Sequence, residues 1–212
     1  MKILKKILFV FFILLPISNI FVQNAYANFI ASGDNLSTSN YEIRTFDTSA
    51  QTTDPRDITF SNDGKKVFTV EQGTKSVFEY ILSTPYNIST AAFVQSLSVS
   101  GQSSKPFKVK FNNDGSKMFI AGRTERKVFE YSLSTNFDIS SASVTYTGNF
   151  IDVSSQLGTE KLNGLTFSPD GKIMIITEQG FGLHQYSLNK SFDLSGGANF
   201  IRSAEVPTLL NG

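Results

Sequence analysis

Two Glu-Gln-Gly tripeptides hold the side chains that are best placed for metal chemistry. Glu71-Gln72-Gly73 and Glu178-Gln179-Gly180 each begin eight residues after the aspartate of an Asp-Gly pair. Carboxylates that recur at matching positions of a repeat can meet at one opening, and a hard cation such as Ca²⁺ prefers oxygen ligands. The alternative is that both glutamates are polar residues flanking a turn. The third matching position, Ala121-Gly122-Arg123, has no carboxylate.

His184 is the only histidine, and the chain has no cysteine. Two related segments have Phe78 and Phe129 at this position, which predicts a packing role for His184. Ser-His-Asp catalysis would need His184 beside an activated serine, and the chain has no Gly-x-Ser-x-Gly turn, phosphate loop or dinucleotide fingerprint. The lack of cysteine also excludes disulfides, thiolate metal sites and a cysteine nucleophile. We predict no catalytic residue; the sequence leans away from an enzyme without deciding the question.

These positions recur because the chain repeats a strand, an Asp-Gly turn and a second strand. The three copies are Arg56–Glu71, Phe107–Ala121 and Asn163–Glu178. The phenylalanines that end the first strands are spaced by 51 and 56 residues, and the turn glycines keep the same spacing. Asp-Gly between two apolar strands predicts a hairpin, because glycine accepts the positive φ of a tight turn.

Each repeat is predicted to form four short strands, because apolar residues alternate along it without a helical period. The predicted strands, in order, are Arg56–Phe60, Val67–Glu71, Val77–Leu82 and Ala92–Val99, then Phe107–Phe111, Met118–Ala121, Val128–Leu133 and Val144–Ile151, then Asn163–Phe167, Ile173–Thr177, Leu183–Leu188 and Asn199–Val206. The connector before each fourth strand repeats an aromatic residue, Asn or Asp, and an aliphatic residue. This pattern predicts a loop held by two buried side chains.

Four strands per unit of about 50 residues predict an all-β fold of four-stranded antiparallel β-propeller blades. The predicted blades span residues 56–99, 106–151 and 162–206. The turn Ser168-Pro169-Asp170-Gly171-Lys172 resembles that of bacterial propeller repeats of the YVTN and WD-like type, and the other copies depart from it at the proline. The resemblance implies the fold over about residues 41–206 and implies no particular activity, because propellers have many functions.

Three complete blades are fewer than the roughly four to eight that close a propeller. Residues 41–46 are predicted as an orphan N-terminal outer strand, so the expected fold is an open arc or partial propeller. Three explanations stay open: a fragment of a longer propeller, a homodimer that completes a ring, or an arc capped by another protein. An uncovered arc would expose two apolar faces, which soluble monomers rarely do.

In a propeller, the turns between second and third strands share one face with the segments that join the blades. We predict that this face binds the ligand. The candidate ligands for Ca²⁺ at the channel mouth are the carboxylates Glu71 and Glu178, and Asn163 lies on the same face. The other residues of the predicted binding face are Asp54, Arg56, Asp57, Gln72, Lys105, Arg123, Glu160, Lys161 and Gln179.

The segment Asn163–Gly171 also resembles the Asn-Gly-Leu-x-Phe-Ser-Pro-Asp-Gly segment of gluconolactonase-type propellers. In that family the asparagine is a metal ligand at the channel, and the resemblance implies this role for Asn163. The equivalent positions hold Arg56 and Phe107, so the polar ring of that family is not visible here. The alternative function that this resemblance implies is a lactonase-like, metal-dependent hydrolase with a cation at the channel mouth.

The first 27 residues have the pattern of a secretory signal peptide. Three lysines precede the apolar run Ile7–Leu15, and Ala25-Tyr26-Ala27 offers small residues for cleavage near Ala27. An uncleaved anchor is the alternative, although nine apolar residues fall short of the ~20 that a spanning helix needs. Cleavage predicts a secreted or periplasmic protein without a stable membrane span.

The chain that remains after cleavage has 16 Lys and Arg and 18 Asp and Glu, a net charge of −2. There is no basic surplus, so we predict no nucleic-acid partner. The sequence favours an exported β-propeller repeat protein that acts as a binding or scaffold module for a protein or envelope ligand.

Overall fold

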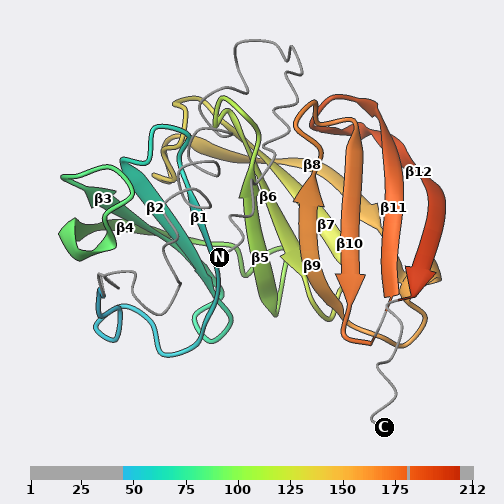
Figure 1. Ribbon diagram of the computed structural model, residues 1–212, viewed down its shortest axis with the longest axis horizontal. Coiled ribbons are helices and arrows are strands. Elements are labelled where there is room, and N and C mark those ends of the chain that lie inside the picture. The colour runs from blue at the N-terminus through green and yellow to red at the C-terminus, as the bar shows by residue number, and fades with distance from the viewer. Residues whose placement is uncertain (1–44, 181, 206–212) are drawn as a thin grey trace, which may run out of the picture. The chain divides into compact units, whose positions relative to one another are not determined.

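The computed structural model describes residues 45–180 and 182–205, which belong to the second of the two units into which the chain divides, residues 44–212. Figure 1 shows three four-stranded antiparallel sheets in this unit, each built from strands that follow one another in the chain. This arrangement confirms the predicted fold of propeller blades. No helix of the described part is long and apolar enough to cross a membrane.

The three sheets are called blades 1 to 3. Blade 1 consists of β1 (Pro55–Phe60), β2 (Lys66–Glu71), β3 (Ser76–Leu82) and β4 (Ala91–Ser98). Blade 2 consists of β5 (Pro106–Phe111), β6 (Lys117–Gly122), β7 (Lys127–Leu133) and β8 (Val144–Asp152). Blade 3 consists of β9 (Leu162–Phe167), β10 (Ile173–Glu178), β11 (Gly182–Lys190) and β12 (Asp193–Glu205). Two short helices interrupt the connections, η2 (Ile88–Thr90) and α2 (Ser154–Leu157).

Blade 3 differs from the prediction in its outer strands. β11 and β12 extend into the predicted connector, where Lys190 pairs with Asp193. The pairing skips residues between this pair and Leu188–Ala198, and Gly197 in the skipped segment has φ +74°. A glycine accepts this φ without steric cost, so the strand continues through a bulge where blades 1 and 2 leave the sheet.

The predicted orphan strand at residues 41–46 falls mostly outside the described residues. Its last two residues, Thr45 and Phe46, are described and are not in a strand. Phe46 instead packs edge-on against Tyr80 of β3, with ring centroids 5.3 Å apart.

Each Asp-Gly turn is covered by the aromatic residue of its own connector. Gly171 has φ +68°, and a Cβ there would lie 2.1 Å from the ring of Phe192. The backbone N–H of Phe192 also donates to the carbonyl of Gly171 at 2.9 Å. Tyr86 and Phe137 repeat this contact in blades 1 and 2, and all three aromatic residues have positive φ. The glycine is therefore required twice, for its backbone angle and for the space that the ring fills.

The apolar core lies between the blades. Phe68, Val70 and Val77 of blade 1 pack against Val109 and Met118 of blade 2. The same arrangement recurs between blades 2 and 3, where the members include Phe119, Ala121, Val128, Leu165, Met174 and Ile176. Each blade therefore has a front face toward the next blade and a rear face toward the preceding one.

Candidate ligand-binding face

The predicted binding face is built from equivalent pairs of loops. In each blade the turn after the second strand meets the segment that leads into the first strand, through one backbone hydrogen bond. These bonds run from the N–H of Gln72 to the carbonyl of Asp54 (3.4 Å), from Arg123 to Lys105 (2.9 Å) and from Gln179 to Lys161 (2.8 Å). The structure thus brings six of the predicted face residues together in three matching pairs.

An aromatic ring joins blades 1 and 2 at this face. Phe107, the second residue of β5, has three cationic groups close to its ring. The guanidinium carbon of Arg123 lies 4.7 Å from the ring centroid, the Lys108 ammonium 5.3 Å and the guanidinium carbon of Arg56 5.7 Å. These distances are within the range of cation–π attraction. We call Phe107 with Arg56, Lys108 and Arg123 the cation–aromatic patch.

The carboxylates nearest the patch compensate only part of its positive charge. Arg56 forms an ion pair with Asp54 at 2.6 Å. Asp57 lies 3.5 Å from Lys108, and it also accepts a hydrogen bond from a backbone N–H of β5. Arg123 reaches across to blade 3 and donates to the neutral side-chain oxygen of Gln179 at 3.1 Å. Within the described residues Arg123 has no carboxylate partner, so the patch keeps a net positive charge.

Four polar atoms of the face are buried without a hydrogen-bond partner in the described part of the chain. They are Nε of Arg56, Oε1 of Gln72, Nε of Arg123 and Oδ1 of Asn163. A buried polar group that lacks a partner is costly, so such groups are uncommon and call for an explanation. Gln72 and Arg123 lie in the turns after the second strands, and Arg56 and Asn163 lie near the start of the first strands, so these buried atoms gather at the end of the blades that carries the paired loops.

The carboxylate of Glu71, a predicted metal ligand, is engaged within its own loop. It is almost fully buried, and it accepts hydrogen bonds from the backbone N–H and the hydroxyl of Thr74 and from the N–H of Thr53 at 3.4 Å. Burial alone raises the pKa of Glu71, but the hydrogen bonds from Thr74 outweigh it, and the net pKa is lowered. Glu71 thus links the turn after β2 to the segment before β1. This is the turn-flanking role that the sequence left as the alternative.

Blade 2 supplies the same closure from a residue that the sequence analysis missed. Glu125 accepts a hydrogen bond from the backbone N–H of Ser104 at 2.9 Å and one from the hydroxyl of Ser103 at 3.0 Å. Its carboxylate fills the place beside Gly122, where a Cβ would lie 2.6 Å from Glu125 Oε2. Glu125 lies three residues after Gly122, the position that aligns with Glu71. A comparison of aligned positions therefore does not show that the two glutamates have the same role.

In blade 3, Glu178 is paired with the single histidine. Its Oε2 lies 3.1 Å from Nε2 of His184, and Nδ1 of His184 lies 2.7 Å from the hydroxyl of Ser203. His184 is buried in the third strand, as its packing role predicted. The two ring nitrogens are both engaged, so this histidine is held in place by its neighbours.

The remaining predicted residues lie on the face without joining the patch. Lys105, Glu160 and Lys161 are exposed, and Glu160 follows α2 with its N–H bonded to the carbonyl of Leu157 at 2.9 Å. No group of three or more His, Asp and Glu side chains in the described residues is placed to hold a metal ion. Asn163 has an unpartnered oxygen, but its equivalents are the cationic Arg56 and the apolar Phe107. This donor set does not fit a channel-mouth cation of the gluconolactonase type.

Comparison with solved structures supports the fold. A protein from Lactobacillus plantarum matches with a TM-score of 0.53 and 16% sequence identity, over 71% of this chain and 41% of its own. A protein from Bacteroides uniformis, provisionally named a 6-phosphogluconolactonase, matches with a TM-score of 0.51 and 16% identity, over 72% of this chain and 41% of its own. At such low identity the likeness shows the blade fold alone. The chain spans well under half the length of these proteins.

Sequence comparison adds nothing to this: no family model matches the chain, and no curated protein matches it either.

Proposed function

We propose that this chain is the blade repeat of an exported binding module, and that the cation–aromatic patch receives an acidic segment of a partner protein. The observation that supports the proposal most is the ring of Phe107 with three cationic groups within 5.7 Å, drawn from two blades. The expected signal peptide supports export.

The chemistry of the patch favours a carboxylate-rich ligand. Arginine presents a planar set of donors that matches a carboxylate, and arginine and aromatic residues are enriched among the residues that dominate protein interfaces. Arg123 is held in position by Gln179 at 3.1 Å and by the Phe107 ring, so it loses little freedom on binding.

The test is a binding titration with labelled peptides of equal length, one rich in glutamate and one with glutamine in its place. Arg123→Ala and Phe107→Ala should weaken binding of the glutamate peptide by roughly tenfold or more. Lys172→Ala is the matched control, because it removes an exposed cation from the Asp-Gly turn at the other end of the strands. Equal affinity for both peptides, or unchanged binding by Arg123→Ala, would reject the proposal.

The same preparation separates binding from metal-dependent hydrolysis. Because the donor set around Asn163 does not fit a cation, millimolar Ca²⁺ should leave the melting temperature unchanged. A rise that disappears in Asn163→Ala, together with turnover of a simple sugar lactone, would favour the hydrolase instead.

A further inference from the structure

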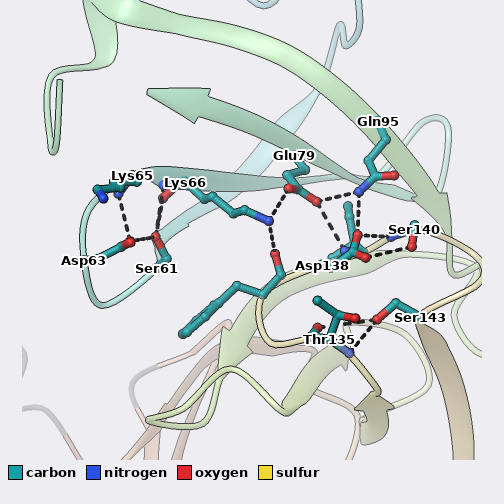
Figure 2. Close-up of polar contacts among 12 residues, drawn as sticks. Ser61, Asp63, Lys65, Lys66, Glu79, Gln95, Thr135, Asp138, Ser140 and Ser143 are labelled. Carbon is teal, nitrogen blue, oxygen red and sulfur yellow. Dashed lines mark hydrogen bonds and ion pairs between the residues drawn. The ribbon is translucent and has the colours of Figure 1, made fainter. Parts of the chain in front are cut away.

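A buried lysine–glutamate pair joins blade 1 to blade 2. Glu79 of β3 forms an ion pair with Lys66 of β2 at 2.7 Å (Figure 2). The carboxylate also accepts the backbone N–H of Ile139, in the connector of blade 2, at 3.2 Å. Gln95, in the outer strand of blade 1, donates to Glu79 and to Asp138 of that connector, at 2.8 Å in each case (Figure 2). An aspartate on the rear of blade 2 is therefore received by a donor on the front of blade 1.

The junction between blades 2 and 3 repeats this design. Lys117 lies 3.4 Å from Glu130, whose carboxylate accepts the backbone N–H of Leu194 at 2.7 Å. Glu130 also accepts from the side-chain amide of Asn149, in the outer strand of blade 2, at 3.2 Å. Asp193, in the connector of blade 3, lies 3.5 Å from Lys117. Each internal junction thus joins a cation, an acceptor and an outer-strand donor on one blade to an aspartate and a backbone N–H on the next.

The front of blade 3 has the same groups, but its positive charge comes from another strand. Ile173 and Gln185 stand where blades 1 and 2 have lysine and glutamate. Arg202, in the outer strand, pairs with Gln185 across the sheet as Gln95 pairs with Glu79. The Nε of Arg202 donates to Oε1 of Gln185 at 2.9 Å. At the junction positions, the front of blade 3 therefore has an acceptor and a cationic outer-strand donor, and it has no carboxylate.

No described blade covers this face. Ile175 and Leu183 on it are half-buried, whereas their equivalents in blades 1 and 2 are completely buried. Together with Gln185 and Arg202 they line a cavity of about 220 Å³. Arg202 is exposed, and it forms no ion pair with any described residue. An apolar surface with a guanidinium beside it suits an aliphatic side chain that lies next to a carboxylate.

We propose that the front of blade 3 binds the rear of a further blade of the same propeller, one whose connector has an aspartate followed by an aliphatic residue. The connectors of blades 2 and 3 have this pair as Asp138-Ile139 and Asp193-Leu194. In the proposed junction the guanidinium of Arg202 binds the aspartate, and Oε1 of Gln185 accepts the N–H that follows, as the Glu79 carboxylate does in blade 1. The aliphatic side chain fills the cavity. This contact does not depend on the ligand of the cation–aromatic patch.

The rear of blade 1 in a second copy of the chain lacks this aspartate. Its connector has Asn87, whose Oδ1 accepts from the N–H and the hydroxyl of Ser89, at 3.1 and 2.7 Å. Against this rear, Arg202 would be covered without a carboxylate, and a buried charge without a partner is strongly unfavourable. Tyr86 and Ile88, on either side of Asn87, match the aromatic and aliphatic residues of the other connectors. At these three connector positions, a copy of this chain therefore differs from the proposed partner only at the residue that meets Arg202.

The first test appends a blade that has the aspartate. In the test chain, residues 28–205 are followed by a second copy of residues 99–152, which form the linker and the strands of blade 2. The copy carries the substitution Phe150→Trp. Because the chain has no tryptophan of its own, fluorescence during urea denaturation reports the appended blade alone. The appended blade should fold and unfold cooperatively.

A double-mutant cycle then measures the contact between Arg202 and the appended aspartate. Arg202→Ala, and Asp138→Asn in the appended copy, should each destabilise the appended blade, and the two effects should be coupled by about tenfold in the unfolding equilibrium constant. Lys172→Ala is the matched control, because it removes an exposed cation from the Asp-Gly turn and should show no coupling to the aspartate. An appended blade that stays unfolded, or a cycle in which the effects of Arg202 and the aspartate add without coupling, would overturn the proposal.

The second test uses the chain from Asn28 without an added blade, with light scattering to measure mass. Asn87→Asp gives the rear of blade 1 the missing aspartate, so it should lower the dissociation constant for self-association roughly tenfold. Adding Arg202→Ala should abolish this gain, and Asn136→Asp, which adds the same charge at an exposed position, should not produce it. If Asn87→Asp associates no better than the wild type, the aspartate has no such role. If Arg202→Ala dissociates the wild-type chain, a second copy already covers the face. Either result would overturn the proposal.

Discussion

The substitution Glu79→Ala tests whether the Lys–Glu pair holds neighbouring blades together. It removes an almost fully buried carboxylate that accepts from Lys66, Gln95 and the backbone N–H of Ile139. The partners stay in place, so a lysine ammonium and a backbone donor lose their acceptor at the junction.

The expected cost follows from the burial of these groups. Breaking a buried ion pair by removing one partner costs about 3–5 kcal/mol, because the remaining charge is left uncompensated. The Lys66 side chain keeps 28% exposure, so water can partly replace the carboxylate. We therefore expect a loss of about 3 kcal/mol in the free energy of unfolding. For a domain of this size, that corresponds to a fall of roughly 6–12 °C in the melting temperature.

Urea denaturation followed by tyrosine fluorescence measures the loss, with the melting temperature as a second readout. The sharpest control is Lys66→Ile/Glu79→Gln, which copies the residues of blade 3. This double variant has no unpaired charge and keeps an acceptor for Ile139, so it should be more stable than Glu79→Ala. A loss below about 1 kcal/mol for Glu79→Ala, the value of an exposed pair, would refute the reasoning. So would a double variant that is less stable than the single one.

Two further predictions concern the turns and the loop face. Gly171→Ala should destabilise the protein by about 2 kcal/mol or more, because alanine is strained at this φ and its Cβ would displace the Phe192 ring, whereas Gly101→Ala, with open space around it, should be nearly neutral in the same denaturation assay. Burial raises the pKa of Glu125, but the hydrogen bonds that Glu125 accepts from Ser104 lower it by more, so the net pKa lies below the ordinary value of 4.5. The contribution of Glu125 to stability is therefore present above pH 4.5 and is lost as the pH falls through the folded pKa. Unfolding measured across this window should be less pH-dependent in Glu125→Gln; an unchanged pH dependence would contradict the assignment.

The blade fold could be predicted because its determinants are local. Alternation of apolar residues marks each strand, and Asp-Gly marks each hairpin, so the strands of blades 1 and 2 lie within one residue of their predicted ends. The contact between Phe192 and Gly171 could not be predicted, because two strands, β10 and β11, separate these residues in the sequence. The extension of β11 and β12 to the Lys190–Asp193 pair was not predicted either. It depends on the bulge at Gly197, whose positive φ keeps the chain in the sheet.

The candidate site was predicted less completely than the fold. Pairing of equivalent loops brought Arg123 and Gln179 onto one face as expected, because the repeat fixes their positions. Phe107 was noticed only as a departure from Asn163, although it lies at the centre of the cation–aromatic patch. Glu125 escaped because its carboxylate reaches the loop from a different position of the turn. Which partners a long side chain contacts depends on the folded structure, and an alignment of the repeats does not show these contacts.

The differences among the three repeats that bear on the proposals fall in two places. Ile173, Gln185 and Asn87 depart from their equivalents at the two faces that no described blade covers. Arg56 and Phe107 depart from Asn163 on the loop face, where polar atoms lack partners. The two internal junctions both keep a lysine, a glutamate and an aspartate in contact or close by. The repeat therefore keeps its Lys–Glu–Asp arrangement at the junctions within the described blades and changes it at the two faces that no described blade covers.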